Sequence, residues 1–203
     1  MLTAVIVLVA CTGGAAPTYS GTDMQEYLPL DGIFTVQYAT EDTAFAYNLL
    51  VTKLTPTEQD GSVEIVTLQH SNEETGEIFG AVKWSNAEGL RVHGYRVGGE
   101  GDFTTFDTPV SLASETMFRG DVVTTETNGM SFSSELLGFE SCPVPWGQDW
   151  DGCAHLSLDD GGAGMPFAGD YWLISRYGVA WMQLADMSQP WKLADHDWTE
   201  EAR

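Results

Sequence analysis

The chain has 203 residues, and thirty acidic side chains face only eight basic ones, so the formal net charge is -22. Hydrophobic residues make up 43% and aromatic residues 11% of the sequence, which is typical of a globular chain with a real core. A surface this negative repels nucleic acid and bare anionic headgroups, so neither is expected as a partner. The acidic residues are spread along the whole chain, which favours adaptation to a saline habitat over a specific cation site.

The first eleven residues form an apolar run that ends in Ala10 and Cys11. The run is too short to span a bilayer, which takes roughly 20 residues, but its length suits the hydrophobic region of a secretory signal. The order of apolar run, small residue, cysteine and flexible segment resembles the lipobox of bacterial lipoproteins. No Lys or Arg precedes the run. The alternative is a buried β-strand, because residues 5–9 have high β-propensity.

The lipobox resemblance implies that Cys11 is acylated and holds the protein on a membrane through its lipid anchor. Thr12, and not Asp, follows the cysteine, which by the same resemblance favours the outer membrane. We therefore expect a signal peptide over residues 1–10, the lipidated cysteine and a flexible tether over 11–25, and an all-β domain over 26–203. The tether is rich in Gly, Ala, Pro and Ser, which bury too little surface to become ordered.

From residue 33 onward the pattern is strand after strand, separated by turn residues. The expected strands cover residues 33–40, 44–54, 62–70, 77–84, 90–97, 122–127, 130–139, 154–158, 171–175 and 178–185. The spacing predicts an all-β fold, a single antiparallel meander that forms a strongly curved sheet, an open barrel or a two-layer sandwich. We expect residues 103–118 to be irregular, with a short helical turn within 110–117. Beyond Pro190 we expect an acidic tail whose Trp191 and Trp198 pack back onto the sheet.

Three short landmarks carry a second resemblance: YLPLDG at 27–32, FRGD at 118–121 and YWLISRYGVAWMQL at 171–184. They resemble the Y-[FL]-P-L start, the middle segment and the closing Tyr-Trp hairpin of a broad class of bacterial lipoproteins. Two departures are Ala180, where that class has a second glycine, and residues 34–36, where it often has Trp-x-Tyr. The resemblance implies a curved antiparallel sheet or incomplete barrel, without an established enzymatic activity.

The remaining cysteines, Cys142 and Cys153, form an even pair once Cys11 is assigned to the lipid. In an exported, oxidising setting such a pair predicts a disulfide. It would close a short loop and stabilise the fold by roughly 2–3 kcal/mol. A zinc site needs four ligands, and no recognisable spacing supplies the others.

The loop between these cysteines carries Trp146 and Trp150. One interpretation is that both tryptophans cap an open end of the sheet. The other is that at least one is exposed on a rigid loop and anchors a protein, glycan or lipid partner, since a rigid aromatic loop loses little entropy on binding.

Four carboxylates lie near this loop, Asp149, Asp151, Asp159 and Asp160, and they are weak candidates for calcium ligands. Residues 149–152 lack the remaining ligand positions of an EF-hand loop, and thirty carboxylates make such neighbours common by chance. We therefore expect no metal and no cofactor.

No pattern points to catalysis. The four histidines, His70, His93, His155 and His196, are scattered without a paired metal-ligand spacing, and we expect each to be a surface or sheet-face residue. Neither a Gly-x-Ser-x-Gly elbow nor a phosphate-binding or dinucleotide glycine loop is present. We assign no catalytic residue and expect that the protein is not an enzyme.

The hypothesis that follows is a membrane-anchored exported lipoprotein, a non-catalytic binding or structural module of the cell envelope. Its partner would be an envelope protein, a glycan or a lipid. Two alternatives stay open: an envelope hydrolase that uses paired carboxylates, and a lipid-binding carrier that holds an acyl chain inside the curved sheet. A sealed interior without an apolar cavity would exclude the carrier.

Overall fold

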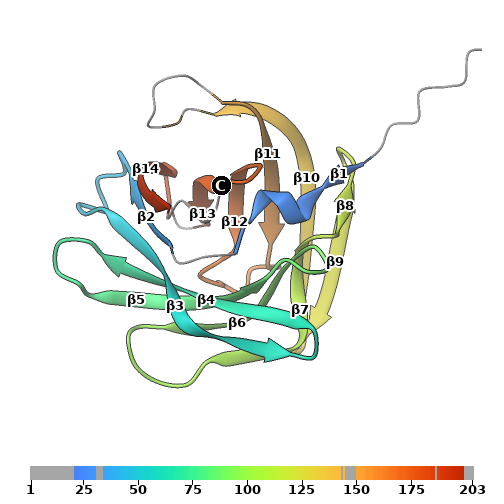
Figure 1. Ribbon diagram of the computed structural model, residues 1–203, viewed down its shortest axis with the longest axis horizontal. Helices are drawn as coiled ribbons and strands as arrows, with labels where there is room; N and C mark the ends of the chain where they lie inside the picture. Colours follow the sequence, from blue (N-terminus) through green and yellow to red (C-terminus); the bar gives the residue numbers. More distant parts are fainter. Residues whose placement is uncertain (1–20, 31–33, 143, 145–149, 186, 199–203) are drawn as a thin grey trace, which may run out of the picture.

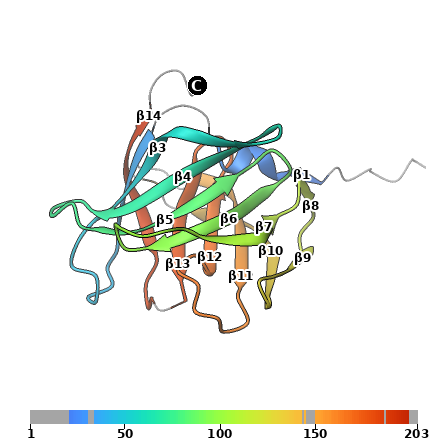
Figure 2. The same cartoon turned by 90° about the horizontal axis from the view of Figure 1, so that it is seen from below.

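The computed structural model describes residues 21–30, 34–142, 144, 150–185 and 187–198. Twelve strands form one antiparallel sheet that curves strongly on itself (Figure 1). The predicted all-β meander is confirmed, and the sheet takes the form of a nearly closed barrel, as the perpendicular view in Figure 2 also shows. In the described part of the chain, no helix is long and apolar enough to cross a membrane.

The strands of the main sheet are six to thirteen residues long. They are β2 (Phe34–Ala39), β3 (Leu49–Asp60), β4 (Val63–Asn72), β5 (Ile78–Ser85), β6 (Leu90–Val97), β7 (Thr104–Ala113), β9 (Val122–Thr127), β10 (Met130–Cys142), β11 (Trp150–Asp159), β12 (Gly169–Ile174), β13 (Gly178–Leu184) and β14 (Trp191–Trp198). Two further strands, β1 (Thr22–Asp23) and β8 (Thr116–Met117), pair with each other, and a 3₁₀-helix, η1 (Met24–Tyr27), follows β1.

The strand order is β7-β6-β5-β4-β3-β2-β14-β13-β12-β11-β10-β9. Strand β14 lies between β2 and β13, so the first and last strands of the main sheet are neighbours in its middle. The expected acidic tail is therefore a strand of the sheet, and its Trp191 is buried. The edges of the sheet are β7 and β9.

These two edges lie side by side and are joined through side chains (Figure 1). The hydroxyl of Thr127 accepts from the Thr108 amide at 3.0 Å, and the hydroxyl of Thr125 accepts from the Ser111 amide at 3.1 Å. The Asn128 carboxamide accepts from the Asp107 amide at 2.9 Å. Side chains of β9 and its turn thus satisfy backbone donors of β7 that would otherwise lie on an open edge.

One end of the barrel is closed by the N-terminal segment. Met24 is fully buried, and its amide donates to the Glu115 carbonyl at 2.9 Å. The Asn86 side chain donates to the Leu28 carbonyl at 2.9 Å. The sequence assigned residues 11–25 to the tether, but residues 22–25 belong to β1 and η1. Met24 explains why the ordered domain begins before residue 26. Its large apolar side chain is stabilised by burial, whereas the small residues of the expected tether gain little from it.

The expectation for residues 103–118 is wrong, because this segment forms β7 and β8 and contains no helical turn. Phe106, Val110 and Leu112 all point into the core. Register shifts between β6 and β7 break the regular alternation of inward and outward residues. The sequence of β7 therefore lacks the period of two that predicts a strand.

The strand expected at 44–54 begins later and runs through Pro56 to Asp60. The register with β4 shifts between Leu54 and Glu58, so Pro56 is not paired with a residue of β4. A strand tolerates proline at such an irregularity. Residues 44–48 form a loop instead, and this loop contributes to the site described below.

Candidate binding cavity

The interior of the barrel contains an apolar cavity of about 70 Å³, here called the inner cavity. Leu28 and Pro29 line it at the closed end. Val36, Val51, Leu68 and Trp84 are among the strand residues of its wall. The inward positions of several strands supply this wall because every second residue of a strand points to the same face.

A second cavity of about 360 Å³, the outer cavity, lies toward the opposite end of the barrel. Four aromatic residues line it: Phe45, Tyr47, Phe79 and Trp191. The Tyr47 ring lies 4.9 Å from Phe79 and 5.6 Å from Trp191, and Phe45 lies 5.6 Å from Trp191. Met165 and Met187, from the loops before β12 and β14, complete an apolar mouth.

The two cavities adjoin, and the boundary between them is here called the neck. Five residues line both cavities: Leu49, His70, Val82, Pro166 and Leu184. His70 is the imidazole in this otherwise apolar set. It pairs across the sheet with Val51 and with Gly80.

The loops around the mouth are held by side-chain hydrogen bonds. Asp42, before β3, accepts from the Ala44 amide at 3.0 Å and from the amide and hydroxyl of Ser188 at 2.8 Å, which ties two loops together. These hydrogen bonds hold the pKa of Asp42 below its ordinary value, and the one from the Ala44 amide has the largest effect. Asp160 accepts from the Gly162 and Met165 amides at 2.9 and 2.6 Å. The mouth is therefore pre-formed.

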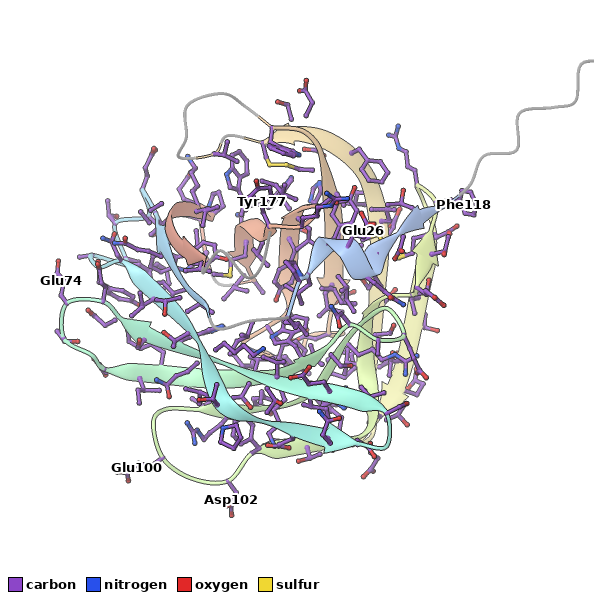
Figure 3. The ribbon with its side chains drawn as sticks, viewed as in Figure 1. Glu26, Glu74, Glu100, Asp102, Phe118 and Tyr177 are labelled. Carbon is purple, nitrogen blue, oxygen red and sulfur yellow. A yellow bond between two sulfur atoms is a disulfide. The ribbon has the colours of Figure 1, made fainter. Side chains whose placement is uncertain are left out.

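The rim outside the mouth is acidic. Glu74, Glu100 and Asp102 are exposed on the loops that follow β4 and β6. Figure 3 places these three side chains on the opposite side of the molecule from Phe118. Together with the net charge, this rim favours uncharged or cationic ligands over anions.

The predicted disulfide between Cys142 and Cys153 is confirmed. Both cysteines belong to a small apolar cluster with Val144, Ile174 and Ala180. Trp150 packs against this cluster, is only partly accessible, and its ring lies 5.6 Å from that of Tyr177. Trp150 thus has a packing role, and recognition of a partner by it stays a prediction. Trp146 lies outside the described residues.

The four carboxylates considered for calcium do not come together as one described site. Asp149 lies outside the described residues, and Asp151 is exposed. Asp159 accepts from the Gly161 amide at 2.9 Å, and Asp160 holds the loop before β12. Within the described ranges, no group of three or more His, Cys, Asp or Glu side chains is placed to hold a metal ion.

A histidine and a carboxylate meet on the outer face of the sheet. His155 Nδ1 lies 2.8 Å from Glu140 Oε1, and the His155 ring stacks on Trp172 with ring centroids 4.2 Å apart. The hydrogen bond from His155 is the main cause that lowers the pKa of Glu140. Desolvation raises this pKa, and a second hydrogen bond from Trp172 lowers it further. This is the kind of pair that the hydrolase alternative requires, but neither residue lines the inner or outer cavity.

His70 is the residue that reasoning from the sequence did not single out. Its signal is the alternation in β4, where Val66, Leu68 and His70 share one face and the first two are buried. This period of two places the histidine on the inner face of a predicted strand. The period of two could not predict that a cavity lies beside His70.

Comparison with protein-family models, with curated proteins and with solved structures finds no match to this chain.

Proposed function

We propose that this protein is an exported binding module of the cell envelope that holds an apolar, lipid-like molecule inside its curved sheet. The observation that supports this proposal is the pair of adjoining apolar cavities between a closed end and an aromatic mouth. Sites for small molecules are concave, mostly apolar, largely pre-formed and roughly 300–1,000 Å³ in volume. The outer cavity lies in that range, whereas ordinary cores leave few voids larger than a water molecule.

The lipid anchor on Cys11 is part of the same proposal, although residue 11 lies outside the described residues. Strand β1 lies at the closed end of the barrel, where η1 contacts the residues before β8. A tether that leads to β1 therefore reaches the barrel at the end opposite the mouth. The mouth then faces away from the membrane that holds the anchor and is open to a ligand from the aqueous side.

Binding is tested with the full chain carrying Cys11→Ser, which removes the acylation site and the need for detergent. N-phenyl-1-naphthylamine, an uncharged apolar dye, should bind saturably with increased fluorescence. Ala185→Trp places a large ring at the mouth from an exposed loop position, so the fold is spared. We expect this variant to lower the affinity for the dye at least tenfold, which corresponds to about 1.4 kcal/mol.

The matched control is Ala87→Trp, which adds the same ring at an exposed turn of the closed end. It should bind the dye as the parent chain does. Absence of saturable binding by the parent, or an equal loss in both tryptophan variants, would contradict the proposed cavity function.

A further inference from the structure

His70 is the polar side chain of the neck, and it has no hydrogen-bond partner among the described residues. It lines both the inner and the outer cavity, and part of its surface is accessible because the cavities reach the ring. A hydrogen bond between a ligand and this ring would add roughly 0.5–1.5 kcal/mol to the binding free energy.

Two tyrosine hydroxyls in the wall of the inner cavity are already used in hydrogen bonds. The Tyr38 hydroxyl donates to the Val179 carbonyl at 3.0 Å, and the Tyr171 hydroxyl donates to the Phe167 carbonyl. These tyrosines therefore stabilise the barrel, while the His70 ring is left available to a ligand.

The imidazole of His70 is uncharged near neutral pH, because burial lowers its pKa to about 4. A neutral imidazole presents one donor and one acceptor, which matches an alcohol or an amide. Lys53 donates to the Leu30 carbonyl, and Arg96, which lines the outer cavity but not the inner one, has its guanidinium 5.1 Å from the centre of the Phe103 ring. None of the five described residues of the neck is cationic, so a carboxylate held beside His70 would be buried without a charged partner.

We infer that the ligand is a single-chain amphiphile with an uncharged hydroxyl or amide group, which hydrogen-bonds to His70 at the neck while its chain fills the aromatic outer cavity. This inference rests on the proposed function and adds the chemical class and the orientation of the ligand. The acidic rim and the net charge of -22 act in the same direction, since both disfavour anionic amphiphiles.

The experiment compares three ligands with the same chain length: decane, 1-decanol and decanoate. Each displaces N-phenyl-1-naphthylamine from the full chain carrying Cys11→Ser near neutral pH. We expect 1-decanol to bind about tenfold more tightly than decane, the factor that one additional hydrogen bond supplies. Decanoate should bind more weakly than 1-decanol.

The variant that tests the residue is His70→Leu, which replaces the imidazole with an apolar side chain of similar size at the neck. It should bind decane at least as well as the parent chain and lose the preference for 1-decanol. His70→Gln, which keeps a donor and an acceptor, should restore much of that preference, a rescue that a purely structural role would not produce. His93→Leu is the matched control, because His93 contacts Ser85 and lines neither cavity.

The outcomes separate the two proposals. If the dye binds but His70→Leu keeps the preference for 1-decanol, the role of His70 is wrong and the cavity function stands. If decanoate binds most tightly, the assignment of an uncharged ligand is wrong. If the dye shows no saturable binding to the parent chain, the proposed function itself fails.

Discussion

At the scale of single residues, His70 combines two properties that conflict in an ordinary core. Its neighbours along β4, Val66 and Leu68, are buried apolar side chains, yet the imidazole can bind a proton. Burial favours the neutral ring, because a charged imidazolium loses its hydration inside the barrel. The resulting difference between folded and unfolded states makes the stability depend on pH.

We predict that the stability contributed by a neutral His70 is complete above about pH 6.5 and falls as the pH decreases toward about 4. The pKa of the ring is near 6.5 in the unfolded chain and about 4 in the folded protein, so the unfolded state binds more protons in this window. Between about pH 7 and pH 5 this should cost roughly 2 kcal/mol. Urea unfolding at several pH values measures the effect.

The comparison chain is His70→Leu, which cannot titrate at this position. The difference in unfolding free energy between parent and variant should change by roughly 2 kcal/mol across this range, since the carboxylates contribute equally to both. Parallel pH profiles for the two chains would contradict the buried, neutral histidine.

At the scale of elements, local turn chemistry decides which strands can be predicted. Strand β9 ends and β10 begins at the predicted residues, Thr127 and Met130, around an Asn128-Gly129 turn. Both turn residues have positive φ, 52° and 75°, which Asn and Gly tolerate best. Strand β7 was missed because its alternation is interrupted by register shifts, which depend on the partner strand.

The seam between β7 and β9 leads to a prediction about stability. Thr125→Val together with Thr127→Val keeps the shape of both side chains and leaves the amides of Ser111 and Thr108 without their acceptors. We expect a loss of about 1–3 kcal/mol in unfolding free energy, because each of these two partly buried hydrogen bonds contributes roughly 0.5–1.5 kcal/mol. Chemical denaturation measures the loss.

The control for the seam is Thr124→Val, on the same strand but exposed. This change should stay within about 0.5 kcal/mol of the parent chain, as surface substitutions usually do. If the double variant is as stable as this control, the side-chain hydrogen bonds do not hold the two edges together.

At the scale of the whole molecule, the expected anchor and the mouth of the outer cavity lie at opposite ends of the barrel. The segment before β1 reaches the closed end, and the mouth lies at the other. We predict that Cys11→Ser moves the protein from the membrane fraction to the soluble fraction of a host that acylates lipoproteins. Mass spectrometry of the parent chain should find acyl chains on a peptide that begins with Cys11.

A variant that replaces both Cys142 and Cys153 with Ala is the control, because it removes the two disulfide-bonded cysteines and leaves Cys11 unchanged. It should stay in the membrane fraction. An unacylated Cys11 in the parent chain, or equal release of both variants, would contradict the lipid anchor and leave the cavity proposal unaffected.

The sequence by itself determined the class of fold, most hairpins and the pairing of Cys142 with Cys153, because alternation, turn residues and cysteine arithmetic are local or countable properties. Only the tertiary structure decided that β14 lies between β2 and β13, that β7 meets β9, and that the interior is hollow around His70. These features depend on contacts between residues far apart in the chain. The alternation of one strand shows which side chains point inward, but the space between them is set by all twelve strands together.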